Sequence, residues 1–152
     1  MVLNESYTLS NGVTIPKLGL GTWMIDDTNV ATIVKEALAI GYRHIDTAQA
    51  YGNERGVGEG VRQSNVAREE IFVTTKLAAE IKDYDEAVKA IDESLEKMAL
   101  DYIDLMIIHS PQPWSEFRNG EHFFEGNLQA WKALEEAYQS GKLRAIGVSN
   151  FD

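Results

Sequence analysis

The feature that most constrains the fold is an alternation, after Pro16, of short apolar segments with longer amphipathic ones. Short and continuously apolar segments are typical of strands that are buried on both faces of a parallel sheet. Five segments have this character: Leu18–Gly21, Arg43–Asp46, Ile71–Thr75, Asp104–His109 and Arg144–Ser149. Since strand and helix alternate throughout, the sequence predicts an α/β fold with right-handed crossovers.

Three of the intervening stretches have the periodicity of amphipathic helices. Apolar residues recur at helical spacing over Val30–Leu38, Val88–Met98 and Leu128–Tyr138, and each stripe is predicted to face the core. The stretch Asn53–Gln63 is a weaker helix candidate, because its three glycines lower helix propensity. Ahead of these elements, Asn11-Gly12 lies between two β-prone runs, which predicts an N-terminal hairpin.

Two α/β architectures fit this pattern, an open doubly wound sheet and a (β/α) barrel. A doubly wound nucleotide-binding sheet carries a glycine-rich fingerprint after its first strand. Gly19-Leu20-Gly21 lacks the third glycine, and Gly56-Val57-Gly58-Glu59-Gly60 has the wrong spacing and follows no strand. A Rossmann-type nucleotide site is therefore not expected in this segment.

Composition narrows the classes of partner. The net charge of −10 argues against a nucleic acid, since such binding requires a basic surface. No apolar run approaches a membrane span of about 18 residues, and the first ten residues lack a signal-peptide pattern. The absence of cysteine excludes disulfides, thiolate metal sites and a catalytic cysteine. A cytoplasmic protein without nucleic-acid or membrane partners is expected.

Polar residues collect where the predicted strands end. Asp46, Lys76, His109 and Ser149 lie at the carboxyl ends of four strands, and Tyr51 lies in the loop after one of them. Each of these residues taken alone has an ordinary structural explanation, such as a cap or a loop aromatic. In a (β/α) barrel, however, the carboxyl ends of the strands form one rim, where active sites are built. The shared position predicts a site, and no metal-ligand cluster is apparent on this rim.

The chemistry of these side chains favours proton donation to a carbonyl. A phenol is a weak acid near neutral pH, but a nearby ammonium favours the phenolate and makes the phenol a better donor. Lys76 can serve Tyr51 in this way, and Asp46 can hold the ammonium in place. The imidazole of His109 can orient the carbonyl. Because no side chain supplies a hydride, a nicotinamide cofactor is implied.

Five motifs together resemble the aldo-keto reductase superfamily, and they span nearly the whole chain. The stretch from Gly52 to Gly58 is similar to that of bacterial reductases of 2,5-diketogluconate and glyoxal. The motifs are Gly19-Leu20-Gly21-Thr22-Trp23, Arg43-His44-Ile45-Asp46-Thr47-Ala48-Gln49-Ala50-Tyr51-Gly52-Asn53-Glu54, Ile71-Phe72-Val73-Thr74-Thr75-Lys76, Asp104-Leu105-Met106-Ile107-Ile108-His109-Ser110-Pro111 and Ile146-Gly147-Val148-Ser149-Asn150-Phe151.

The resemblance implies a fold and an activity. The fold would be the N-terminal part of a (β/α)8 TIM barrel, with about five βα units and a capping β-hairpin. Residues 1–152 would form a single incomplete barrel domain, with residues 1–16 as the hairpin and 17–152 as the first half of the barrel. The activity would be NADPH-dependent reduction of aldehydes or ketones to alcohols, with a small-molecule carbonyl as substrate.

The resemblance also assigns roles to single residues. The catalytic set would be Asp46, Tyr51, Lys76 and His109, in which Tyr51 donates the proton and His109 orients the carbonyl. The cofactor would be bound by Thr22, Asp46, Ser149 and Asn150. The substrate would contact Trp23, Tyr51, His109 and Trp114.

The resemblance is incomplete at one position beside the catalytic histidine. Ser110 stands where many members carry tryptophan, and Trp114 is expected to replace that ring. The aromatic-rich segment from Pro111 to Gly126 is either a substrate lid or a locally packed loop, and the sequence does not choose between them.

A complete barrel of this kind needs about 250 residues. The 152-residue chain is therefore expected to be inactive or nearly so by itself, since much of the cofactor site would be missing. The alternative hypothesis is a catalytically inert half-barrel that self-associates. Its first and last strands, near Leu18–Gly21 and Arg144–Ser149, would expose unpaired edges that invite pairing with another chain.

Overall fold

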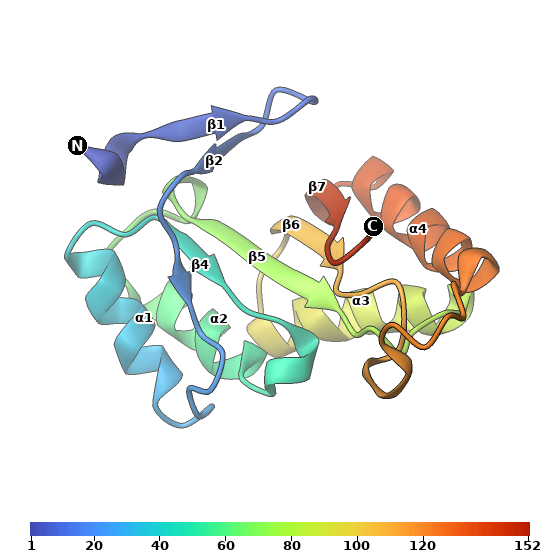
Figure 1. The fold of residues 1–152 in the computed structure, drawn as a ribbon. Helices are drawn as coiled ribbons and strands as arrows, with labels where there is room; N and C mark the ends of the chain where they lie inside the picture. The colour runs from blue at the N-terminus through green and yellow to red at the C-terminus, as the bar shows by residue number, and fades with distance from the viewer.

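The computed structural model describes residues 1–152, which form two sheets and four helices (Figure 1). All five predicted strands are confirmed, with ends that differ by at most two residues. They form a parallel sheet of β3 (Leu20–Gly21), β4 (His44–Asp46), β5 (Phe72–Leu77), β6 (Ile103–Ile108) and β7 (Leu143–Val148). The predicted hairpin is also present as β1 (Ser6–Thr8) and β2 (Thr14–Pro16), which pair antiparallel.

The four predicted helices are present as well, including the glycine-rich one. They are α1 (Val30–Ala39), α2 (Glu54–Gln63), α3 (Tyr84–Met98) and α4 (Phe124–Gln139). Four short 3-10 turns accompany them: η1 (Val2–Asn4), η2 (Gln49–Tyr51), η3 (Arg68–Glu70) and η4 (Trp114–Glu116). None of the helices combines the length and the apolar character needed to cross a membrane.

The strand order distinguishes between the two architectures that the sequence left open. The parallel sheet runs β3-β4-β5-β6-β7, so every strand pairs with its neighbour in the chain. A doubly wound sheet would instead reverse its strand order at a switch point. Consecutive helices also pack on one another, and they follow the sheet in chain order (Figure 1). This sequential order is that of βα units in a barrel.

The hairpin lies across the end of the sheet where the strands begin (Figure 1). Asn11 at its tip donates a hydrogen bond from Nδ2 to the carbonyl of Arg144, at the start of β7. The opposite end of the sheet, where the strands finish, is free of the hairpin. The loops that carry the predicted site residues occupy that opposite end.

The predicted core stripe of α4 is wrong in part. Leu128 is 63% exposed and Tyr138 is also exposed, whereas Leu134 is fully buried as expected. The buried face of α4 is instead built mainly from alanines, at positions 130, 133 and 137. Small side chains therefore make up most of the buried face of α4, and Leu128 and Tyr138 lie on its exposed side.

The glycines of α2 are explained by close helix packing. A Cβ atom at Gly58 would lie 2.2 Å from the carbonyl oxygen of Met98 on α3, and one at Gly56 would lie 2.5 Å from that of Asp27. At Gly60 the nearest atom would be the carbonyl oxygen of Ala31, at 2.7 Å. Backbone contact on both sides therefore requires glycine here, and tertiary packing overrides its low helix propensity.

We expect Gly58→Ala to destabilise the chain by about 1–3 kcal/mol, the usual cost of overpacking. The reason is that Met98 contributes backbone atoms, which cannot rotate away from the new methyl group. Urea unfolding followed by circular dichroism measures the change. Gly21→Ala is the control, because nothing lies within 4 Å of a Cβ there. Equal stability of the two variants would contradict the close approach of α2 to α3.

Candidate active site

The parallel register brings the predicted site residues to one rim. Asp46 pairs with Thr74 across β4 and β5, and Lys76 pairs with Ile107 across β5 and β6. Directly paired residues and residues two apart share a face of a sheet. Asp46, Thr74 and Lys76 therefore point to the same side, opposite to Thr75.

Lys76 lies at the centre of the site. Its ammonium Nζ is 2.8 Å from both carboxylate oxygens of Asp46, 2.9 Å from the carbonyl oxygen of Thr47 and 3.2 Å from the hydroxyl of Tyr51. Lys76 is only 9% exposed, so the neighbouring carboxylate compensates a largely desolvated charge. Three of the four predicted catalytic residues thus meet at one nitrogen atom.

The turn that carries Tyr51 is closed on itself by buried polar side chains. The Thr47 hydroxyl donates to Oδ1 of Asn53 at 2.6 Å, which ties the two ends of the turn together. Asn53 Nδ2 in turn donates to the carbonyls of Thr22 and Ile25. Gly52 adopts a left-handed conformation with φ of 69°, which lets the chain turn into α2 directly after Tyr51.

His109 is the fourth member of the predicted catalytic set. Its ring makes an edge-to-face contact with Tyr51, with centroids 5.8 Å apart, and a second with Trp114 at 5.0 Å. Burial lowers the pKa of His109 below its ordinary value, and the Lys76 ammonium lowers it further, against the opposing effect of Asp46. Nδ1 is buried without a hydrogen-bond partner. The imidazole is therefore neutral at pH 7 and presents Nε2 as the nitrogen available to a ligand.

Ser149 and Asn150, predicted to bind the nicotinamide, lie together beyond the end of β7 and both contact the carbonyl of His109. The Ser149 hydroxyl and the Asn150 amide Nδ2 both donate to the carbonyl of His109, at 2.6 and 2.8 Å. Asn150 Nδ2 also donates to Ser149 Oγ at 3.3 Å, so Ser149 Oγ keeps one acceptor lone pair, and Asn150 Oδ1 offers its own. A carboxamide NH2 group is a donor that suits such acceptors. These residues therefore fit the amide of a nicotinamide ring.

Thr22 lies next to this site, but its side chain points into the protein interior. Its side chain is fully buried, and its hydroxyl donates to the carbonyl of Asp46 at 2.9 Å. Its amide N–H donates to the same carbonyl. Thr22 thus fixes the backbone of Asp46, and its side chain presents no accessible surface to a ligand in this structure. No three acidic or histidine side chains lie close enough together to bind a metal ion.

The two tryptophans predicted to contact the substrate differ in position. Trp114 packs against His109, and its other side meets Phe117 with ring centroids 5.6 Å apart. Trp23 follows β3 at the same rim, but it is 70% exposed and makes no aromatic contact with the catalytic residues. The structure therefore brings Trp114 to the catalytic set and leaves Trp23 outside it.

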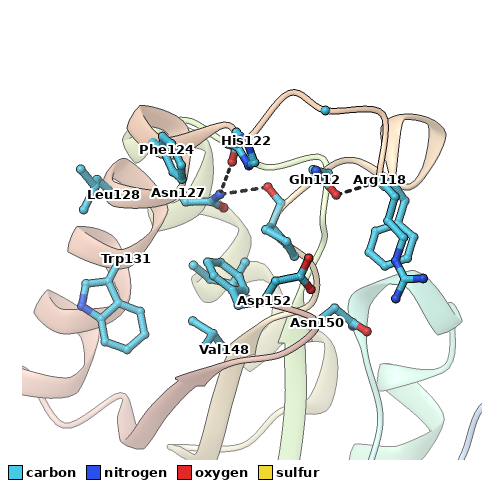
Figure 2. Close-up of a pocket in the computed structure, with 15 residues that line it drawn as sticks. Gln112, Arg118, His122, Phe124, Asn127, Leu128, Trp131, Val148, Asn150 and Asp152 are labelled. Carbon is cyan, nitrogen blue, oxygen red and sulfur yellow. Dashed lines mark hydrogen bonds between the residues drawn. The ribbon is translucent and has the colours of Figure 1, made fainter.

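A cavity of about 930 Å³ opens beside the site, between the β6–α4 loop, α4 and the end of β7 (Figure 2). Apolar and aromatic side chains line much of it, together with Asn150 and Arg118. The loop above it is packed by its own polar side chains. Gln112 binds the backbone of Glu121 and Arg118, and Asn127 donates to the carbonyls of Pro111 and His122. The loop is therefore locally packed, and it also forms one wall of the cavity.

Sequence reasoning missed a second group of polar residues beside the site. Gln49 and Glu54 lie on either side of Tyr51, and their side chains turn away from the rim toward α3 and β5. Glu54 is 3% exposed. A glutamate at the start of a helix is usually exposed there and favoured by the helix dipole. Nothing in the sequence therefore indicated that Glu54 would be buried.

Comparisons with known proteins agree with this geometry. Residues 17–152 match the model of the Aldo/keto reductase family. The 9,11-endoperoxide prostaglandin H2 reductase of Trypanosoma cruzi is 47% identical over 95% of this chain, and the glyoxal reductase of Bacillus subtilis is 45% identical over 98%. These matches cover 48% and 50% of the two relatives, so the chain spans about half their length.

A solved structure extends the agreement to the fold. The Bombyx mori aldo-keto reductase in complex with NADP superposes with a TM-score of 0.83 at 39% identity. The match covers 97% of this chain and 51% of the other. The parallel sheet and its helices thus correspond to about half of a (β/α) barrel enzyme. On sequence and fold together, the chain belongs to the aldo/keto reductase family.

Proposed function

We propose that these residues carry out the proton transfer in an NADPH-dependent reduction of aldehydes or ketones to alcohols in the cytoplasm. The observation that supports the proposal most is the convergence of Asp46, Tyr51 and Lys76 at the Lys76 ammonium. A phenol beside a held ammonium is a proton donor suited to a carbonyl oxygen. The proposal extends the family assignment to the chemistry of this site.

The proton moves from the Tyr51 hydroxyl to the carbonyl oxygen. Because Lys76 Nζ donates to Tyr51 Oη, the phenol's own hydrogen is free to point toward a substrate. The same ammonium stabilises the phenolate that remains after transfer. Asp46 keeps the ammonium in place through two short contacts. A bound nicotinamide cofactor supplies the hydride that the carbonyl carbon must receive.

His109 orients the carbonyl. The neutral ring can donate one hydrogen bond from Nε2 if Nδ1 is the unprotonated nitrogen, and the burial of Nδ1 without a partner is compatible with that tautomer. Trp114 packs on the imidazole and limits its rotation. The carbonyl oxygen would thus receive hydrogen bonds from both Tyr51 and His109.

The cofactor would be held at this rim by Asp46, Ser149 and Asn150, with Thr22 acting through the Asp46 backbone. The substrate would occupy the space bounded by Tyr51, His109 and Trp114, with Trp23 as a further wall. The adjoining cavity has the volume usual for small-molecule sites. The Bacillus subtilis relative is a glyoxal reductase, which favours small reactive carbonyls as substrates.

We expect Tyr51→Phe to lower turnover by about 10²–10⁴-fold, the usual contribution of a general acid. The test uses a chimaeric chain in which the second half of the Bacillus subtilis glyoxal reductase follows residue 152, with NADPH oxidation as the readout. Tyr138→Phe makes the same chemical change on an exposed tyrosine and is the control. Turnover of Tyr51→Phe close to that of the control would remove Tyr51 as the proton donor.

The 152-residue chain by itself is expected to bind NADPH weakly and to turn over at a negligible rate. Its proposed cofactor contacts come only from the ends of β3, β4 and β7. Titration with NADPH, followed by quenching of the tryptophan fluorescence, measures the affinity. Micromolar binding together with NADPH oxidation by an aldehyde would show that these contacts suffice.

A second function, self-association of the chain, is supported by the exposed apolar surface beside β7. β7 has only one neighbour in the sheet, so its outer edge carries unpaired backbone groups. Large apolar side chains flank this edge on α4 and at the end of β7, and they are exposed. They are Phe124, Leu128, Val148 and Phe151. An unpaired edge next to such a surface favours pairing with a second copy of the chain.

We therefore expect light scattering to show dimers or larger species rather than a 17 kDa monomer. The double variant Leu128→Lys/Val148→Lys should shift the distribution toward monomer, because it places charge on the proposed contact. Ile40→Lys, on an exposed residue that follows α1, is the control. A monodisperse monomer of the unmodified chain would exclude this function.

A further inference from the structure

A network of four polar side chains joins the turn that carries Tyr51 to β5 and α3. We define the Glu54 network by its members, Gln49, Glu54, Thr75 and Ser94. Three of them are buried, and Gln49 is half-buried. The network lies away from the rim where the proposed chemistry occurs. Thr75 points to the face of the sheet opposite to Lys76, and Gln49 and Glu54 bind partners on α3, on β5 and just beyond β5.

Two hydrogen bonds join side chains of the Glu54 network to one another. Gln49 Nε2 donates to Ser94 Oγ at 2.9 Å, and the Ser94 hydroxyl lies near enough to Glu54 to lower the pKa of its carboxyl group. The Thr75 hydroxyl donates to Glu54 Oε2 at 2.7 Å. Thr75 thus fixes the carboxylate by a short hydrogen bond, and Ser94 is its second polar neighbour. Burial raises the pKa of Glu54, and these two hydroxyls and the Lys97 charge act against that rise.

Gln49 also attaches the turn to two other elements. Its Nε2 donates to the Ala90 carbonyl on α3 at 3.1 Å, and its Oε1 accepts from the Ala78 N–H just beyond β5 at 2.8 Å. Gln49 and Tyr51 belong to the same 3-10 turn, η2. One side chain of the turn is therefore fixed to α3 and β5, while another presents the phenol to Lys76.

We propose that Gln49 and Glu54 are positioning residues that hold the Tyr51 phenol beside Lys76. The inference rests on the proposed role of Tyr51 as proton donor. Gln49 fixes the turn on one side of Tyr51, and Glu54 fixes the start of α2 on the other. Glu54 also binds Thr75, the residue before Lys76, so the network links the backbones of both reacting side chains.

Directional hydrogen bonds explain why polar residues occupy this buried position. Apolar side chains of similar volume would fill the space, but they would not fix the rotation of a three-residue turn. A fully satisfied buried network specifies one arrangement, because any other leaves a desolvated polar group unpaired. The expected effect of disrupting it is thus a displaced phenol in a folded chain.

The deciding measurement is the nuclear Overhauser effect between the Tyr51 ring and the Lys76 side chain, in the 152-residue chain with labelled tyrosine and lysine. Lys76 Nζ lies 4.8 Å from the centre of the Tyr51 ring, so the effect should be detectable in the unmodified chain. Gln49→Met keeps the side-chain length but removes its hydrogen bonds, and the effect should weaken at least threefold. Gln63→Met, on an exposed glutamine of α2, is the control and should leave it unchanged.

Glu54→Gln provides a second test that preserves shape. The neutral amide oxygen is a weaker acceptor than a carboxylate, so the hydrogen bond from Thr75 weakens and the Overhauser effect should again weaken. Glu59→Gln on the outer side of α2 is its control. An unchanged effect in folded Gln49→Met and Glu54→Gln overturns the inference, and if one variant does not fold the other decides.

Turnover in the chimaeric chain gives the catalytic consequence. Gln49→Met should lower kcat by roughly ten- to a hundredfold, as expected for a small displacement of a reacting group, with the KM for NADPH unchanged. A purely stabilising role would lower the unfolding temperature and leave both kcat and the Overhauser effect unaltered. Absent turnover in the unmodified chimaera would count against the proposed function alone, because the Overhauser effect does not depend on catalysis.

Discussion

The site depends on the pairing of the Lys76 ammonium with Asp46. A nearly buried ammonium is unfavourable unless an anion compensates it, and here both carboxylate oxygens lie 2.8 Å from Nζ. The pairing is possible because β4 and β5 are parallel and in a register that places both residues on one face. The Lys76 ammonium also binds the Tyr51 hydroxyl, and Thr22 fixes the backbone of Asp46, so the neighbouring residues are arranged around this charged pair. A shift of register by one residue would turn Lys76 toward the helices and abolish the site.

The two faces of β5 carry residues with different proposed roles, one in the chemistry and the other in positioning. Lys76 points to the rim, whereas Thr75 points toward α2 and α3 and binds Glu54. The glycines of α2 allow the helix to lie so close to α3 that a methyl group would collide with the Met98 backbone. Close helix packing and the Glu54 network are therefore connected, because Gln49, in the turn before α2, binds Ser94 of α3.

Much of the fold and the catalytic set could be predicted from the sequence, since both depend on local patterns. Continuous apolarity marks the five buried strands, and the polar residues that follow each strand mark the rim. Because parallel strands end at the same edge of the sheet, these residues could be predicted to lie together even though the loop conformations were unknown. The stretch Asn53–Gln63 was only a weaker helix candidate because of Gly56, Gly58 and Gly60, and the structure has a helix there over Glu54–Gln63. Its stability comes from packing that a propensity scale does not contain.

The alternation of strands and helices, the polar residues at the strand ends, the four proposed catalytic residues and the family resemblance could thus be recognised from the sequence alone. Only the tertiary structure decided which partner each side chain meets. It directed Leu128 and Tyr138 of α4 outward, left Trp23 exposed, and set Trp114 against His109. It also committed the donors of Ser149 and Asn150 to the His109 carbonyl and buried Glu54 between β5 and α3. The physical reason is that hydrogen bonds and ring contacts between residues far apart in the chain depend on distances of a few ångströms, which periodicity does not encode.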